Sequence, residues 1–480
     1  MPPLKRPKKE EEIPTASKVD RISDLPEDVL HHLLSLMPAH DAVRTGVLAH
    51  TWRHLWMSVP AIRFTNAESY SFGCANRLIR FVDRVLLLLS RRQGAPLHSC
   101  EFHLEEDEVL SNGYLAANEG RFSRWIWRAL RLRVRVLRFH LGFDHIISLP
   151  DMPLLSDHLT TLELLFVTAN ESVLDFSGCP TLVHLIMELC YINSANISSS
   201  SLKHFQMIRG TFQDNHRTRV SLPNLVSLEL DEVNGRIPLL ESMPSLETAI
   251  VRIGDDHPDT CEKGGYSECG DDSCEGCHGS DDDRTHGVLL RTLLRATNLE
   301  LSADPDMFVF KRDLKWCSTF TKLKTLVLSG WFLIDDLRAL TWFLQRSPVL
   351  EKLTLQISKL HKIPEGTAGR YAPIEKSVAS DHLELVEIKC WKVDEMVGAI
   401  LKILNDSRIP LEKIQIHKYS SFGCFKFVCT DFNPDEGKKN QDGCGDNFPV
   451  MLGHAQGAVE IYLFEDRRFW YSFVWLLLIV

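Results

Sequence analysis

The chain has 480 residues, of which 44% are hydrophobic and 25% charged. At about 150 residues per domain it holds up to about three domains, and its globular composition excludes a wholly disordered, collagenous or multi-span membrane protein. The net charge of −10 gives no support to a general affinity for polyanions, so neither nucleic acid nor a membrane is expected as a partner.

Residues 1–19 are expected to form a disordered tail of mixed basic and acidic character. Lys5, Arg6, Lys8 and Lys9 make a short basic cluster, which is typical of nuclear import and equally of a solvated tail. No apolar run follows this cluster, so a secretory signal is not expected and the 13 cysteines are expected to stay reduced. The expected location is the nucleus, the cytoplasm or both.

Residues 20–64 predict a small unit of three short helices. Asp24 and Glu27 have the spacing of a helix-capping pair, Pro26 is tolerated in a first turn, and Pro38 ends the first helix. Two more short helices are predicted over 41–49 and 51–56.

The first of these helices carries more apolar surface than a small bundle needs. Its apolar residues cover about 160° of the helix circumference, which is broader than a usual core-facing stripe. They are Val29, Leu30, Leu33, Leu34, Leu36 and Met37. A unit of this size without a metal or a disulfide is marginal alone, so the surplus predicts a covering partner or a neighbouring domain.

One apolar pattern recurs through residues 95–416. An apolar residue, two spacers, a second apolar residue, one spacer and a third form a triplet, and the last two positions fit a short strand. The triplets begin at Leu97, Val134, Leu159, Leu182, Leu202, Leu225, Leu246, Ala296, Leu323, Leu350, Leu383 and Leu411. The return segments are expected to be helical or irregular, as in residues 335–344.

Such units cannot bury both apolar faces alone, so they are expected to stack into a parallel-sheet solenoid. The alternative is a set of ordinary αβ units around an open sheet. The fold class predicted is α/β: a small N-terminal three-helix unit followed by an irregular repeat solenoid, with parallel strands on its concave face.

Residues 254–287 interrupt the repeats with eleven acidic residues and no Leu, Ile, Val, Met, Phe or Trp, which predicts an exposed, disordered insertion. Zinc ligation by its cysteines is a weak hypothesis, because only the last two have good ligand spacing. The four are Cys261, Cys269, Cys274 and Cys277. The alternative is a solvated acidic loop, so no metal or other cofactor is assigned.

Residues 417–480 form an atypical C-terminal segment that departs from the repeat pattern. Its last twelve residues, 469–480, carry no charge. A membrane-spanning helix needs about 20 apolar residues, so a buried last strand or an altered reading frame or splice form is favoured over a tail anchor.

No catalytic motif is present: the sequence has no Gly-x-Ser-x-Gly, no phosphate-binding Gly-x-x-x-x-Gly-Lys, no dinucleotide fingerprint and no His-Glu-x-x-His. The histidines are scattered, and single ones such as His184 and His204 occupy spacer positions of the repeats. The chain is therefore not expected to be an enzyme.

The order of residues in the N-terminal unit resembles an F-box, and specifically the plant F-box proteins that carry leucine-rich repeats and an FBD region. The residues that carry the resemblance include Leu25-Pro26, Leu36-Met37-Pro38, Val47-Leu48 and Trp52-Arg53-x-Leu55-Trp56. Residues of about 316–416 are similar to the FBD-associated part, including Trp316-Cys317 and His382 to Cys390. The unit departs from many relatives at Ala49-His50-Thr51, where they have a basic pair.

The resemblance implies docking on the Skp adaptor of a cullin-RING ubiquitin ligase, with the repeats holding an unknown protein substrate. Nine residues would carry the docking or shape the unit that does it: Leu25, Pro26, Leu30, Leu33, Leu36, Val47, Leu48, Trp52 and Leu55. The resemblance thus predicts a substrate-recognition subunit of an SCF-type ligase. The alternative readings are a non-catalytic repeat scaffold without a ligase role and a zinc-dependent interaction module.

Overall fold

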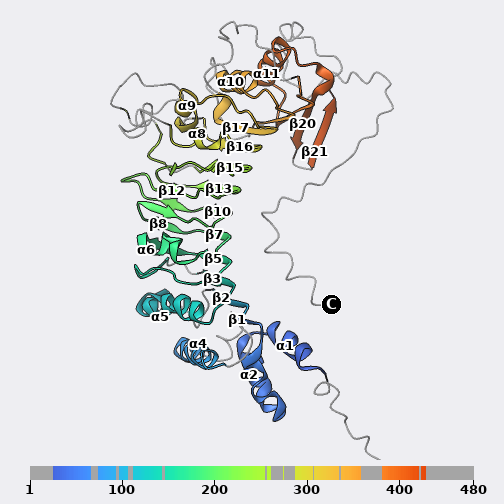
Figure 1. Ribbon diagram of the computed structural model, residues 1–480. Helices are drawn as coiled ribbons and strands as arrows, with labels where there is room; N and C mark the ends of the chain where they lie inside the picture. Colours follow the sequence, from blue (N-terminus) through green and yellow to red (C-terminus); the bar gives the residue numbers. More distant parts are fainter. Residues whose placement is uncertain are drawn as a thin grey trace, which may run out of the picture.

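The computed structural model describes residues 25–65, 74–92, 97–105, 112–142, 146–254, 257–260, 274, 287–305, 307–333, 337–357, 381–420 and 423–428. Its strands follow one another along the length of the molecule, with the N-terminal helices at one end and the C-terminal helices at the other (Figure 1). The fold is mixed α/β, a small helical unit joined to a large parallel sheet.

The N-terminal unit contains α1 (Glu27–Ser35), α2 (Ala39–Arg44) and the 3₁₀ turns η1 (Thr45–Val47), η2 (Thr51–Arg53) and η3 (Leu55–Ser58). Helix α1 begins later than predicted, because Pro26 is its N-cap and its carbonyl accepts from the amides of Val29 and Leu30 at 3.0 and 3.1 Å. Asp24, half of the predicted capping pair, lies outside the described residues.

The predicted second and third helices are broken into shorter turns. A Cβ on Gly46 would lie 3.3 Å from the Cα of Arg53, so the chain folds back tightly here and glycine eases the close approach. The helix predicted over 41–49 therefore ends early, as α2, and the rest of the segment forms η1, η2 and η3.

Fourteen described strands form the main sheet and neighbour one another in chain order. All but the last pair are parallel, whereas β20 and β21 pair antiparallel. The strands are β1 (Ala61–Thr65), β2 (Ser99–Glu105), β3 (Val136–Gly142), β5 (Thr161–Leu165), β7 (His184–Glu188), β10 (His204–Ile208), β13 (Ser227–Val233), β15 (Thr248–Ile253), β16 (Asn298–Ala303), β17 (Thr325–Gly330), β18 (Lys352–Ile357), β19 (Leu385–Cys390), β20 (Ile414–Ser420) and β21 (Gly423–Val428).

The strands predicted from the apolar triplets are confirmed. Each triplet supplies one strand from β2 to β20, and its last two apolar residues point inward, as Leu162 and Leu164 do in β5. The acidic insertion leaves the pairing intact, since Thr248 of β15 lies opposite Asn298 of β16. Strand β1 precedes the predicted repeat region and pairs with β2.

The returns between the middle strands, which were expected to be helical or irregular, are mostly extended. Short strands form a second sheet, β4 (Ile147–Ser148), β6 (Val167–Asn170), β8 (Tyr191–Asn193) and β11 (Thr211–Phe212), and a third, β9 (Asn196–Ser198), β12 (Arg219–Ser221) and β14 (Leu239–Leu240). The turn out of the main strand passes through a left-handed residue in successive repeats, with φ of 57° at Phe166, 50° at Leu189 and 49° at Arg209. After this sharp corner the chain continues as a short strand, in β6, β8 and β11.

Helices occur towards the two ends of the described stack. Near the N-terminal unit are α4 (Ala75–Leu89) and α5 (Asn112–Arg131), on the same side of the main sheet as the short strands (Figure 1). One short helix, α6 (Glu171–Leu174), and the turn η4 (Phe176–Gly178) lie among the middle repeats. Towards the C-terminal end are α8 (Leu290–Leu293), α9 (Val309–Leu314), η5 (Trp331–Leu333), α10 (Arg338–Arg346), α11 (Glu395–Asp406) and η6 (Leu411–Lys413).

The N-terminal unit and the sheet share one hydrophobic core. Ring contacts run from His40 of α2 to Phe81 of α4, with centroids 5.7 Å apart, and from Phe81 to Phe64 of β1 at 6.4 Å. Phe64 stacks on Phe102 of β2 at 5.1 Å, and Phe102 stacks on Trp125 of α5 at 5.4 Å. The small helical unit is therefore packed against the repeats and is not a separate domain on a flexible linker.

The expectation that residues 254–287 are exposed throughout is wrong for its described part. Asp259 is 2% exposed and lies between the guanidinium groups of Arg217, at 2.5 Å, and Arg312, at 3.3 Å. It also accepts the amide of Ile237 at 3.1 Å. His257 is buried as well, between the carbonyls of Gly235 and Gly254. Ion pairs of Asp259 and hydrogen bonds of His257 to backbone carbonyls hold residues 257–260 in the protein.

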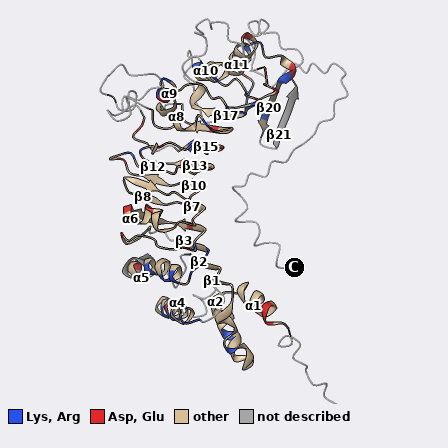
Figure 2. Cartoon of the chain, in the orientation of Figure 1, with Lys and Arg blue, Asp and Glu red and all other residues tan. Residues whose placement is uncertain are grey.

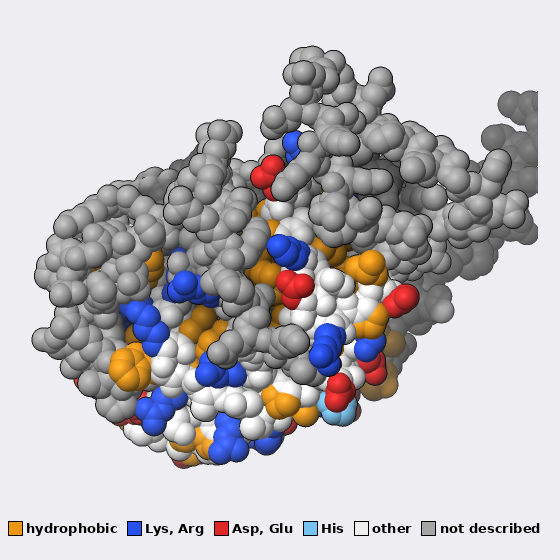
Figure 3. All heavy atoms as spheres, turned by 90° about the horizontal axis from the view of Figure 1, so that it is seen from above, with side chains coloured by type: hydrophobic (Ala, Val, Ile, Leu, Met, Phe, Trp, Pro, Cys, Tyr) orange, Lys and Arg blue, Asp and Glu red, His pale blue; other side chains and the backbone are white. Residues whose placement is uncertain are grey.

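The C-terminal end of the sheet departs from the parallel pattern, as the sequence indicated, in the antiparallel pair β20 and β21. The basic cluster of residues 5–9 and the uncharged residues 469–480 lie outside the described part of the chain. Among the residues that the structure describes, no helix is long and apolar enough to cross a membrane. Seen down the end that carries α10 and α11, basic side chains lie among apolar and uncharged ones (Figure 3).

Candidate functional site

Helix α1 has two apolar faces. Leu30 and Leu34, four residues apart, are 4% and 2% exposed and pack into the core. Leu25, Val29, Leu33 and Leu36 form a second stripe, and their exposed fractions are 38%, 41%, 43% and 53%. The spacing of four and three residues places Val29, Leu33 and Leu36 on one side of the helix axis, and Leu25 lies just before the helix N-cap. An ordinary surface helix has one apolar face, which points to the core, so a second, outward stripe is unusual.

The turn after α2 extends the exposed apolar surface. Val47 is 88% exposed and Leu48 71%, and they are consecutive in η1 and just after it. The chain folds back at this point through the close approach of Gly46 to Arg53, which leaves both side chains outside the core. We refer to Leu25, Pro26, Val29, Leu33, Leu36, Val47 and Leu48 as the outward surface.

The structure sorts the nine predicted docking residues by exposure. Leu30 and Trp52 are buried, so they shape the core and cannot themselves contact a partner, and Leu55 is half-buried against that core. The other six are exposed: Leu25, Pro26, Leu33, Leu36, Val47 and Leu48. Val29, which the sequence analysis placed only among the apolar helix residues, belongs to the same exposed surface.

The amount of exposed apolar surface is large for so small a unit. Its six aliphatic side chains leave in water the equivalent of about three whole residues, and covering each whole side chain is worth about 1.5–3 kcal/mol. Exposed apolar surface gathered on one small unit marks a protein–protein contact more often than a free surface. The geometry can therefore bind an apolar surface of another protein.

The outward surface is held rigidly to the repeats. Pro38, between α1 and α2, forms a parallel bridge with Arg63 of β1, and the guanidinium of Arg92 after α4 donates to the carbonyl of Val59 at 3.2 Å. His40 contacts the ring of Phe81, and burial there lowers the pKa of His40 although Asp41 attracts the charged form. A partner on the outward surface would thus hold a fixed position relative to the sheet.

The face of the main sheet that points away from the hydrophobic core, which we call the outer sheet face, is a second candidate site. Near the N-terminal unit, this face carries a row of ion pairs: Arg63 to Glu101 at 3.1 Å, Glu101 to Arg138 at 2.7 Å, and Arg138 to Glu163 at 2.9 Å. Burial opposes the charge of Glu163, but bonds from His140 and Arg138 lower its pKa. These charges satisfy one another and leave little for a ligand.

Further along the same face, aliphatic side chains lie among more ion pairs, such as those of Arg252 with Asp231 at 3.0 Å and with Glu300 at 2.7 Å. Ile186 of β7, Ile208 of β10, Ile250 of β15 and Val327 of β17 are half-buried on the side away from the core. They lie among polar neighbours such as Gln206, which donates to Glu229 at 2.8 Å. A mixed surface of this kind suits a protein ligand better than a small metabolite.

The described residues contain no group of three or more His, Cys, Asp or Glu side chains that could hold a metal ion. Cys274 is buried, whereas Cys261, Cys269 and Cys277 lie outside the described residues, so the zinc hypothesis stays a prediction. The buried thiols that are described pack as hydrophobic groups, and burial raises the pKa of Cys190 to about 12.

Comparison with known proteins bears directly on this unit. The model of the F-box domain matches residues 22–63. The chain is 27% identical over 401 residues to the meiotic F-box protein MOF of Oryza sativa subsp. japonica, covering 77% of this chain and 80% of that protein. It is also 27% identical over 391 residues to an F-box/FBD/LRR-repeat protein of Arabidopsis thaliana, covering 74% of this chain and 81% of that protein.

Other relatives match a smaller part. An FBD-associated F-box protein of Arabidopsis thaliana is 30% identical over 172 residues, which is 36% of each chain, and a second F-box protein of that plant is matched over 56% of its length. The helices and the outward surface thus belong to an F-box protein. Among F-box proteins, the chain belongs with the plant F-box proteins that carry leucine-rich repeats and an FBD region.

Proposed function

We propose that the chain is the substrate-recognition subunit of an SCF-type ubiquitin ligase. In this role the F-box docks on a Skp-family adaptor, and through it on a cullin, while the repeats hold a target protein. The observation that carries the proposal is the outward surface, which is exposed, aliphatic and part of the segment that matches the F-box. The protein itself would be non-catalytic, since its part is to bring the target close to a conjugating enzyme.

We further propose that the repeats form a leucine-rich-repeat solenoid whose outer sheet face, around Ile186, Ile208 and Ile250, binds the target. Support comes from the chain-ordered parallel strands and from the half-buried aliphatic residues there. The domain boundaries of the sequence analysis and a nuclear or cytoplasmic location remain part of this proposal.

Mixing the purified chain with a Skp-family adaptor and separating the mixture by size-exclusion chromatography tests the ligase role. The unchanged chain is expected to elute with the adaptor. Val47→Glu with Leu48→Glu is expected to elute alone, because both side chains are exposed and two carboxylates cannot be covered by an apolar surface. If the folded, unchanged chain never binds the adaptor, the repeat-scaffold alternative without a ligase role replaces the proposal.

Target binding needs its own experiment. Capture of partners from cells in which degradation is blocked is expected to yield a protein that Ile186→Asp with Ile208→Asp no longer captures, while adaptor binding is kept. Lys322→Asp, at an exposed position outside these strands, is the matched control. Equal capture by all three chains would move the target site away from the outer sheet face.

A further inference from the structure

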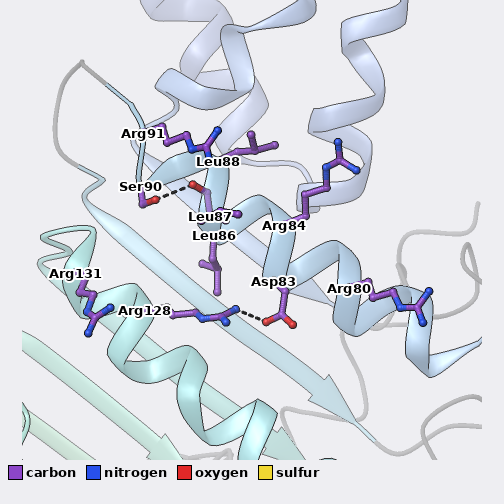
Figure 4. A pocket seen from close by; sticks show the side chains of 10 residues that line it. All are labelled: Arg80, Asp83, Arg84, Leu86, Leu87, Leu88, Ser90, Arg91, Arg128 and Arg131. Carbon is purple, nitrogen blue, oxygen red and sulfur yellow. Dashed lines mark hydrogen bonds and ion pairs between the residues drawn. The ribbon is translucent and has the colours of Figure 1, made fainter.

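Helices α4 and α5 line a hollow that is separate from the outward surface and from the outer sheet face. It has a volume of about 760 Å³ and its lining includes Arg80, Arg84, Arg91, Arg128 and Arg131 (Figure 4). Both helices precede parallel strands, β2 and β3, and therefore run side by side in the same direction. Arg80 and Arg84 lie along α4, Arg91 just after it, and Arg128 and Arg131 in the last turn of α5.

This hollow is basic although the whole chain is acidic. The five arginines of the lining are exposed, and the single acidic residue of that lining, Asp83, is already engaged. Asp83 accepts from the indole of Trp125 at 3.0 Å and from Arg128, and Arg121 lies 3.7 Å away. Figure 4 shows Arg128 reaching across from α5 to Asp83, and Figure 2 shows how charges are distributed along both helices.

The arginines are spread out along the helix. Arg80 and Arg84 lie in α4 and Arg91 lies two residues after its end. With a rise of about 1.5 Å per residue, the three span roughly 17 Å, which is the length of about five residues of extended peptide. A single phosphate needs donors that converge on one point. An extended chain with several carboxylates matches the observed spacing better.

An apolar contact lies in the middle of this charged row. Leu87 is 56% exposed between Arg84 and Arg91, and Leu88 beside it is partly buried in the core. A nucleic acid backbone has no use for an exposed leucine, whereas a peptide side chain does. We propose that the α4–α5 hollow binds an acidic peptide segment of a partner protein, with an aliphatic residue of that segment on Leu87.

The chain's own acidic segment fits this site poorly. Residues 254–287 contain eleven acidic residues but no Leu, Ile, Val, Met, Phe or Trp. Such a segment supplies the charge and lacks the apolar contact. The partner is therefore expected to be another protein, and the segment 254–287 becomes a comparison peptide in the test.

The test uses the full chain and a fluorescein-labelled peptide, Glu-Asp-Glu-Leu-Asp-Glu-Asp-Glu, in fluorescence anisotropy. Binding with a Kd of about 10–100 µM is expected, weakening as salt rises from about 50 to 300 mM. Arg80→Glu with Arg84→Glu is expected to weaken binding at least about tenfold. Arg77→Glu with Arg124→Glu changes the net charge equally on the same helices outside the lining, so its Kd should change less than about twofold.

Equal loss in both double variants would overturn the site, because only long-range charge would then matter. Leu87→Ser should weaken binding several-fold and leave the salt dependence unchanged. Equal binding of a peptide with glycine in place of leucine, or of the 254–287 peptide, would overturn the apolar contact. Tighter binding of a single-stranded oligonucleotide would overturn the peptide assignment, and an unchanged thermal midpoint in each variant shows that the fold is intact.

Discussion

Replacing Leu33 and Leu36 together by alanine tests whether their side chains bind a partner or stabilise the fold. The two side chains are 43% and 53% exposed in the chain alone, so their exposed parts add up to about one whole leucine. Covering that surface is worth about 1.5–3 kcal/mol, and its loss should raise the Kd for a Skp-family adaptor about 10- to 150-fold. Alanine favours helices, so the unfolding free energy should change by less than about 1 kcal/mol.

Two matched variants give this prediction its contrast. Leu34→Ala, one residue along the same helix, removes a side chain that is only 2% exposed and should lower the unfolding free energy by about 2–5 kcal/mol. Leu155→Ala removes a leucine that is 65% exposed, in the segment before β5 and away from the outward surface, and should leave adaptor affinity unchanged. Isothermal titration calorimetry gives the Kd, and thermal unfolding of the same samples gives the stability.

The reasoning fails if the Leu33 and Leu36 double variant keeps the affinity of the unchanged chain. It also fails if that variant loses affinity only in step with a lowered thermal midpoint. The first result would mean that the adaptor does not cover the outward stripe, and the second that the two leucines act only through the stability of the fold.

The other predictions concern the interior. Asp259→Asn should lower the unfolding free energy by about 3–5 kcal/mol, because it leaves buried guanidinium groups without their carboxylate, whereas the exposed Asp157→Asn should have no effect in the same thermal melts. Burial opposes the charge of Asp259, but the neighbouring arginines, chiefly Arg217, lower its pKa to about 2. Because 3.8 is its ordinary value, this contribution is present above about pH 4 and is lost as the pH falls through about 2, so the stability difference between the unchanged chain and Asp259→Asn should shrink there in acid titrations. Phe102→Ala should cost about 3–5 kcal/mol and lower the unfolding midpoints of the F-box and of the sheet together, since the ring links both; separate midpoints by two spectroscopic probes would contradict this.

The repeat strands were predictable because their signal is local. Each triplet places its own two inward residues in a strand, and the neighbouring triplet supplies the pairing edge at a constant offset. The same apolar triplet is present at Val59-x-x-Ile62-x-Phe64, where β1 lies. It was not predicted as a strand because these residues were assigned to the helical unit of residues 20–64. Helix α4 was also readable, since its inward residues Leu78, Val82 and Leu89 have helical spacing.

What the sequence did not provide depended on contacts between distant residues. Asp259 sits in a segment without large aliphatic residues, and its burial depends on Arg217 and Arg312, which are 42 and 53 residues away in the chain. In the same way, the apolar breadth of α1 was clear from the sequence, but which face is inward is decided by Trp56 and Val59, which close the core from the end of the F-box. Local composition cannot supply such partners.

The shared core fixes the position of the F-box relative to the main sheet. His40, Phe81, Phe64 and Phe102 pass from the F-box through α4 into the sheet without a break. Tilting the F-box against the repeats would separate these rings, and each aromatic pair is worth about 0.5–1.5 kcal/mol beyond its buried area. An adaptor bound on the outward surface and a target bound on the outer sheet face would therefore be held at one distance and orientation, so the position of the target's lysines relative to the conjugating enzyme would be set by the fold itself.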